Sequence, residues 1–147
     1  MKRVLPPTYF VLALALSAGL HFLLPIIQLI HSPYRYIGLA LIACGAWLTL
    51  WADGLFKKEG TEIKPFAKPS VLVVRGPFRF SRNPMYLGMG ILLAGVAVLL
   101  GSLTSFLSPV TFLLLMRLVF IPYEEDAMQE TFGGSYAAYR KRVRRWF

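Results

Sequence analysis

Two adjacent carboxylates, Glu124 and Glu125, directly follow an apolar stretch and the pair Pro122-Tyr123. Acidic side chains beside the hydrocarbon of a membrane are costly unless they have a partner, so their presence suggests a role in binding or catalysis. Such a pair could hold an ammonium group or the two hydroxyls of a ribose. The alternative is a pair of ordinary exposed acids next to a membrane span.

Residues 76–88 combine turn signals with arginines and aromatic side chains. Asn83-Pro84 favours a turn that starts a helix, where free backbone N–H groups can bind an anion. The arginines could pair with a carboxylate or phosphate, and the aromatic rings could pack on a cation or an adenine. The alternative is a basic loop whose arginines extend to lipid headgroups. The candidates are Phe78, Arg79, Arg82 and Tyr86.

Other polar residues within apolar stretches give weaker signals. Arg117 lies about two helical turns before Glu124 and could contact a substrate or extend to the membrane surface. His21 and His31 do not have metal-ligand spacing, and the single Cys44 excludes a disulfide and a cysteine-based metal site within this sequence. We therefore predict no metal site.

The elements that must position these residues are membrane helices. Of the 147 residues, 56% are hydrophobic and 16% are charged, against about a quarter charged in soluble domains. This composition excludes a disordered chain, a soluble nucleotide-binding domain and a disulfide scaffold. The net charge of +9 favours contact with anionic lipid headgroups over nucleic acid, because the chain is so apolar.

The sequence predicts an all-α polytopic membrane protein with about four transmembrane helices and a C-terminal amphipathic interfacial helix. We expect two spans within residues 1–56, a loop over 57–84, a helical hairpin over 85–121 and a tail helix within 122–147, all in one domain. Pro25 is expected to kink the first span, and residues 101–104 to form the hairpin turn. The predicted spans are residues 9–30, 36–52, 85–100 and 105–121.

The tail carries an apolar stripe at helical spacing. Gly133-Gly134 is expected to break the helix, with Ser135 as the N-cap of the second part. We interpret the stripe as a membrane anchor at the interface. The stripe consists of Met128, Phe132, Tyr136, Tyr139, Val143 and Trp146.

Basic residues predict the orientation in the membrane. Every Lys and Arg except Arg35 and Arg117 flanks the spans on one side. The positive-inside rule therefore places both termini and the 57–84 loop in the cytoplasm.

Three pieces of the sequence resemble the isoprenylcysteine carboxyl methyltransferase family and the related phospholipid methyltransferases. They are R-N-P-M-Y-L-G at 82–88, the acidic pair at 124–125 and F-G-G-S-Y-A-A-Y at 132–139. The resemblance covers roughly residues 60–147 and implies an integral membrane methyltransferase with a cytoplasmic pocket for S-adenosylmethionine. The implied cofactor contacts are Ser70, Val71, Leu72, Val73, Phe78, Asn83, Pro84, Met85, Tyr86 and Glu124.

Departures from the family pattern narrow the range of substrates that the resemblance implies. Asn83 replaces the histidine of the carboxyl methyltransferases, as in the phospholipid branch, and Phe78 replaces a frequent tyrosine. Phe120 stands where prenylcysteine enzymes place a substrate-binding arginine, which argues against prenylcysteine.

The sequence thus predicts methyl transfer from S-adenosylmethionine to a lipophilic, membrane-dissolved carboxylate, amine or thiol. Glu124 and Arg82 would bind the amino and carboxylate ends of the cofactor, and Glu125 is the candidate base for an amine or thiol acceptor. One alternative is a reductase that uses NADPH, since the C-terminal half also resembles sterol reductases. Another is a non-enzymatic membrane protein that binds anionic lipid.

Overall fold

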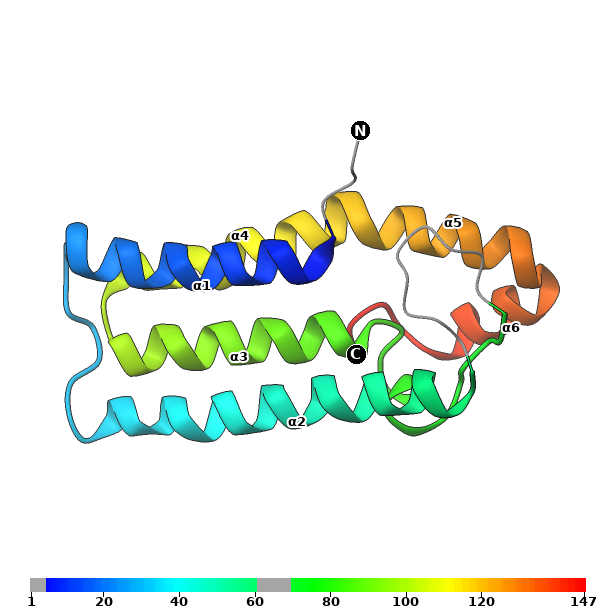
Figure 1. The fold of residues 1–147 in the computed structure, drawn as a ribbon, viewed down its shortest axis with the longest axis horizontal. Helices are drawn as coiled ribbons and strands as arrows, with labels where there is room; N and C mark the ends of the chain where they lie inside the picture. Colours follow the sequence, from blue (N-terminus) through cyan, green and yellow to red (C-terminus); the bar gives the residue numbers. More distant parts are fainter. Residues whose placement is uncertain (1–4, 61–69) are drawn as a thin grey trace.

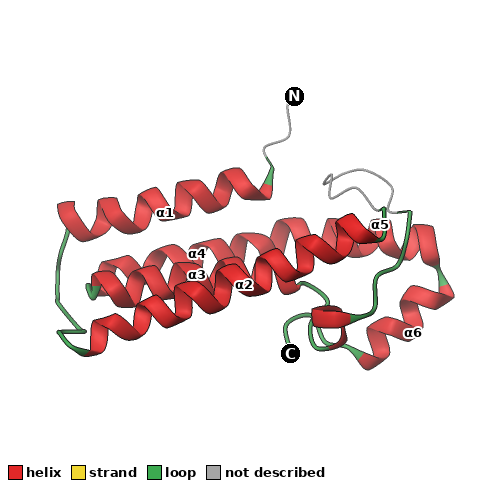
Figure 2. Ribbon diagram, turned by 60° about the horizontal axis from the view of Figure 1, so that its bottom comes forward, coloured by secondary structure: helices red, strands yellow, loops and turns green. Residues whose placement is uncertain are grey.

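The computed structural model describes residues 5–60 and 70–147, and its helices form an elongated bundle (Figure 1). Figure 2 shows this described part as helices joined by loops, which confirms the predicted all-α class. Short 3₁₀ turns lie at Tyr34–Tyr36, Gly76–Arg79 and Leu103–Phe106. The α-helices are α1 (Pro6–Leu23), α2 (Ile37–Lys58), α3 (Pro84–Leu100), α4 (Leu107–Leu115), α5 (Ile121–Phe132) and α6 (Gly134–Arg142).

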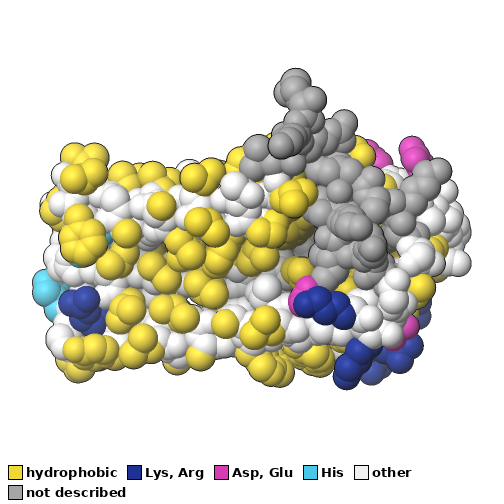
Figure 3. Space-filling view, viewed as in Figure 1, with side chains coloured by type: hydrophobic (Ala, Val, Ile, Leu, Met, Phe, Trp, Pro, Cys, Tyr) yellow, Lys and Arg dark blue, Asp and Glu magenta, His cyan; other side chains and the backbone are white. Residues whose placement is uncertain are grey.

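The long helices have the length and composition of membrane spans. The segments Pro6–Leu23, Tyr34–Lys58 and Leu103–Phe132 qualify on both counts, and the apolar helix α3 is somewhat shorter. Apolar side chains cover much of the long side of the molecule seen in Figure 3. On α2, for example, Trp47 is 61% exposed and Leu50 is 68% exposed. Such a surface is stable in lipid and not in water, so the chain is an integral membrane protein.

The first span differs from its prediction, which was a kinked helix over 9–30. Helix α1 ends at Leu23, and the chain then continues in an extended form. Pro25 explains this end, because proline has no N–H and disfavours helical backbone in the residue before it. The freed backbone pairs with the α3–α4 connection, where Gly101 O accepts hydrogen bonds from Leu29 N and Ile30 N at 2.8 and 3.1 Å.

Helix α1 is fixed to the hairpin by a seam of hydroxyl groups. Ser17 Oγ donates to Ser105 O at 3.3 Å, and Thr104 Oγ1 donates to Leu20 O at 3.3 Å. His21 Nδ1 lies 3.0 Å from Ser102 Oγ. Hydrogen bonds between helices stabilise packing inside a membrane, where water offers no alternative partner.

Helices α2 and α3 touch through their backbones. A Cβ atom on Gly45 would lie 2.5 Å from Gly88 O and 2.5 Å from Leu92 N. Glycine allows this approach because it has no side chain. The contact holds the first half of α3 against the middle of α2.

Helix α5 continues the fourth span without a break. One π-helical turn, Met116–Phe120, joins α4 to α5 just before Pro122. Proline at this position would collide with the carbonyl four residues earlier in a regular helix, and the wider turn relieves the collision. The acidic pair therefore projects from a rigid extension of the span.

The tail turns back after α5. Gly133 has a φ of +50° and is itself the N-cap of α6, so the prediction of Ser135 in that role was wrong. Tyr136, Tyr139 and Val143 are buried in one cluster, with Leu72 of the loop packed against it. The apolar stripe thus covers the loop, and its interpretation as a membrane anchor was wrong for these side chains.

Candidate functional site

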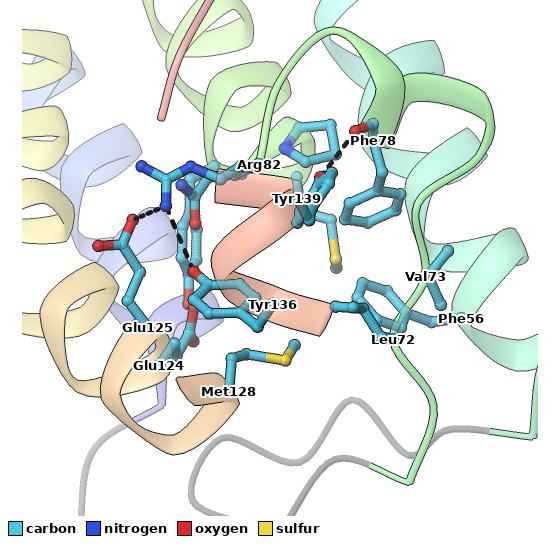
Figure 4. A pocket seen from close by; sticks show the side chains of 14 residues that line it. Phe56, Leu72, Val73, Phe78, Arg82, Glu124, Glu125, Met128, Tyr136 and Tyr139 are labelled. Carbon is cyan, nitrogen blue, oxygen red and sulfur yellow. Dashed lines mark hydrogen bonds and ion pairs between the residues drawn. The ribbon is translucent and has the colours of Figure 1, made fainter. Parts of the chain in front are cut away.

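A cavity lies where α2 ends and α3 begins, beside α5 and α6 (Figure 4). Its volume is about 90 Å³. The loop before α3 and the helices α2, α3, α5 and α6 all contribute side chains to its wall. The lining residues are Phe56, Leu72, Val73, Phe78, Arg82, Asn83, Pro84, Met85, Tyr86, Glu124, Glu125, Met128, Tyr136 and Tyr139.

Glu124 provides one charged wall. It lies in the first turn of α5, and its Oε1 accepts a hydrogen bond from the Tyr86 hydroxyl at 2.5 Å. Tyr86 comes from the first turn of α3 and is 8% exposed. One carboxylate oxygen is thereby oriented by a buried phenol, while the other remains for a cationic or hydroxyl ligand.

Glu125 is bound by two guanidinium groups. Arg145 donates from Nε to Oε1 at 3.1 Å and from Nη2 to Oε2 at 2.7 Å. Arg82 Nη1 lies 3.1 Å from Oε1 (Figure 4). The Glu125 side chain is 8% exposed, so the carboxylate is largely shielded from water, while the Arg145 side chain is 30% exposed. The hydrogen bond to Glu125 raises the pKa of Arg145, which keeps that guanidinium charged.

Arg82 offers a positive charge to the cavity. Its side chain is 9% exposed, and Nη1 also donates to the Tyr136 hydroxyl at 3.4 Å. Its Nε is buried and has no hydrogen-bond partner among the described residues. A buried donor without a partner is costly, so this atom suits an anionic ligand.

The last residues of the chain brace the start of α3. We call residues 143–147 the C-terminal strap. Arg82 N donates a hydrogen bond to Arg144 O of the strap at 3.0 Å, and Ser81 Oγ donates to Arg145 O at 3.2 Å. Asn83 Nδ2 donates to the same Arg145 carbonyl at 3.1 Å. The loop–helix junction that carries Arg82 is therefore fixed by backbone contacts.

Aromatic side chains form the opposite wall. The Phe56 and Phe78 rings meet edge to face with centroids 4.9 Å apart. The Tyr139 hydroxyl donates to Phe78 O at 2.7 Å (Figure 4). Burial raises the pKa of both Tyr136 and Tyr139. Both phenols therefore stay neutral donors near pH 7.

The cavity brings together most of the residues that the sequence singled out. It does not include four of them. Ser70 and Arg79 are exposed, and Val71 is half-buried before the lining residue Leu72. Arg117 is exposed on the π-helical turn. The predicted residues that line the cavity are Leu72, Val73, Phe78, Arg82, Asn83, Pro84, Met85, Tyr86, Glu124 and Glu125.

Some site residues escaped the sequence analysis. Met128, Tyr136 and Tyr139 belong to the apolar stripe, whose contact with the loop depends on the turn at Gly133. Phe56 lies at the end of the second span and gave no signal of its own. Arg145 stands in a basic run, and no pattern separates it from its neighbours.

The geometry favours a ligand with both charges and a flat ring. A carboxylate and a guanidinium, Glu124 and Arg82, share the cavity with several aromatic side chains. A zwitterionic group would satisfy the two charges, and an aromatic base would pack on the rings.

Comparison with known proteins gives one match. A family model described as phospholipid methyltransferase matches residues 34–135. No curated protein and no solved structure matches the chain. The matched segment runs from the turn before α2 through α5 to the turn into α6, and it contains Arg82 and both acids. Helix α1 and the C-terminal strap lie outside it.

Proposed function

The chain belongs to the phospholipid methyltransferase family, and from that premise we propose that it transfers a methyl group from S-adenosylmethionine to a lipophilic acceptor. The family and the apolar helices make it a membrane methyltransferase. The identity of the methyl donor and the class of acceptor are our proposal. The observation that supports them is the cavity with Glu124 and Arg82 in an aromatic wall.

The cavity residues fit the proposed cofactor. Arg82 has a buried Nε in need of an acceptor, which the carboxylate of S-adenosylmethionine would provide. Glu124 would bind the ammonium group through the oxygen that Tyr86 does not use. Phe78 or Tyr86 would pack against the rest of the molecule. The backbone beside Leu72 and Val73, and that of Ser70 and Val71 before them, would complete the binding segment.

When bound, S-adenosylmethionine supplies a methyl group that its sulfonium has already activated. The protein therefore needs no strong acid, and its residues align the reactants. Arg82 is held by the strap and by Glu125, and Glu124 is held by Tyr86, so both charges are fixed before a ligand arrives. Fixed charges orient a ligand without reorganisation of the site.

The acceptor would enter sideways from the membrane. Met85 and Tyr86 line the cavity from the first turn of α3, which is an apolar helix that lies within the bundle. A lipid dissolved in the bilayer could present a carboxylate, amine or thiol there. Arg117 lies outside the cavity, and its role as a substrate contact stays a prediction.

We place the cavity and both termini in the cytoplasm. In Figure 1, α2 ends and α3 begins toward the end of the molecule that α6 occupies. Basic side chains gather there in Figure 3, and positive charge favours the cytoplasmic side.

Calorimetry on the full chain in detergent tests the proposal. S-adenosylhomocysteine should bind the parent, and NADPH should not. Arg82→Ala should lose most of the affinity, while Arg144→Ala should keep it because the Arg144 side chain is exposed. Arg82→Ala leaves Glu125 paired with Arg145, so no buried charge is stranded. Binding of NADPH alone would support a reductase, and binding of neither compound would contradict the proposal.

A further inference from the structure

We propose that Arg145 is a positioning residue that keeps Arg82 available to the ligand. By binding Glu125 with two hydrogen bonds, Arg145 prevents Glu125 from neutralising Arg82. This inference rests on the proposed function, because it concerns the anionic end of the ligand in the same cavity. It replaces the predicted role of Glu125 as a base with that of a counter-ion.

The two arginines bind Glu125 unequally. Arg145 uses both Nε and Nη2 and engages both carboxylate oxygens, which is the strong two-pronged arrangement. Arg82 uses Nη1 on one oxygen, and its Nε has no partner among the described residues. Arg82 lines the cavity, and Arg145 is not among the lining residues. Arg145 therefore acts on a ligand through Glu125 and Arg82.

The charges of the cluster explain why two arginines are needed. Two guanidinium groups and one carboxylate leave one net positive charge, and Arg82 is the arginine of the cluster that lines the cavity, beside Glu125. Within the described chain, the ion-pair partners of Glu125 are Arg82 and Arg145. A buried carboxylate that loses a partner is strongly destabilised.

Without Arg145, Glu125 would take a second donor from Arg82. Arg82 Nη1 already lies 3.1 Å from Glu125 Oε1, and the neighbouring Nη2 could donate to the second carboxylate oxygen, so an end-on two-pronged pair could form. Arg82 and Glu125 would then neutralise each other, and the guanidinium would be drawn away from the ligand. Arg145→Gln should therefore lower the affinity for the ligand, although Arg145 does not line the cavity.

A second substitution separates positioning from a purely structural role. In the double variant Glu125→Gln/Arg145→Gln, Arg82 keeps its charge and no carboxylate competes for it. Affinity should therefore return. If Arg145 served merely to hold the C-terminal strap, the second substitution would remove a further contact and affinity would stay low.

Two further variants complete the series. Arg145→Lys keeps the charge but loses the fork, so its affinity should lie between those of the parent and Arg145→Gln. Arg144→Gln is the matched control, because its side chain is exposed and its backbone carbonyl still accepts from Arg82 N.

The experiment is calorimetry of S-adenosylhomocysteine with each full-length variant in detergent, after size-exclusion chromatography to verify folding. Arg145→Gln should weaken binding by roughly 10- to 100-fold, as for loss of a charge-assisted hydrogen bond. The double variant should recover most of that loss, and Arg144→Gln should match the parent.

The outcomes distinguish this inference from the proposed function. If the parent binds but Arg145→Gln binds equally well, the inference is overturned and the proposed function stands. If the double variant is no better than Arg145→Gln, the positioning role is likewise overturned. If the parent does not bind S-adenosylhomocysteine, the proposed function fails and the inference fails with it.

Discussion

Replacing Glu124 by glutamine removes a charge from the cavity with little change of shape. The Tyr86 hydroxyl can still donate to the amide oxygen of the new side chain, so the existing hydrogen bond is kept. Glu125 and its two arginines are left unchanged. The substitution therefore reports on the charge that Glu124 offers to a ligand.

The size of the effect follows from the kind of bond that is lost. A hydrogen bond to a charged group contributes about 1.5–3 kcal/mol. Since about 1.4 kcal/mol corresponds to a tenfold change in affinity, Glu124→Gln should weaken S-adenosylmethionine binding roughly 10- to 150-fold. The lower limit applies if water reaches the substituted site.

The assay compares Glu124→Gln with Glu130→Gln by calorimetry in detergent. Glu130 lies on the same helix, α5, but it is exposed and does not line the cavity. It controls for the loss of one negative charge from the molecule. Equal affinity of the two variants would refute the assignment of Glu124 to the ligand.

Further predictions concern the scaffold, its pH dependence and its orientation. Gly45→Ala should lower the thermal stability because the new Cβ meets the backbone of α3, whereas Gly54→Ala on the same helix has open space and should not. Tyr139→Phe leaves the Phe78 carbonyl without its donor and should lower the free energy of unfolding by about 1–3 kcal/mol in a denaturant titration. Burial raises the pKa of Tyr139 above its ordinary 10.0, so the unfolded chain loses this proton first and stability should fall above that pH, less steeply in Tyr139→Phe. Reporter fusions after Lys68 and after Phe147 should give the cytoplasmic signal, and an exterior signal at either site would contradict the orientation.

Short-range sequence patterns predicted where helices lie and where one of them starts. The start of α3 at Pro84 follows from the Asn-Pro pair, and the apolar runs identified the helices. The Asp53–Lys57 ion pair at 2.6 Å is an i,i+4 contact of the kind that spacing predicts. The sequence also identified the cavity residues around Arg82, because they are neighbours within one short segment of the chain.

Long-range contacts explain what the sequence did not predict. An apolar run does not reveal that the chain after Pro25 pairs with residues 101–103, because that partner is remote in sequence. Helical period correctly identified the stripe around Tyr136, but it could not choose between lipid and the loop as the covering partner. Arg145 reaches Glu125 because Val143 adopts extended backbone and turns the strap toward α3, which no local rule specifies.

Transfer of a labelled methyl group to lipids tests the proposed reaction itself. Membranes that contain the parent protein or Arg82→Ala are incubated with S-adenosylmethionine labelled on its methyl group, and lipids are then extracted with organic solvent. Label in the lipid extract of the parent should be well above that of Arg82→Ala. Equal label in the two extracts would contradict methyl transfer through the cavity that Arg82 lines.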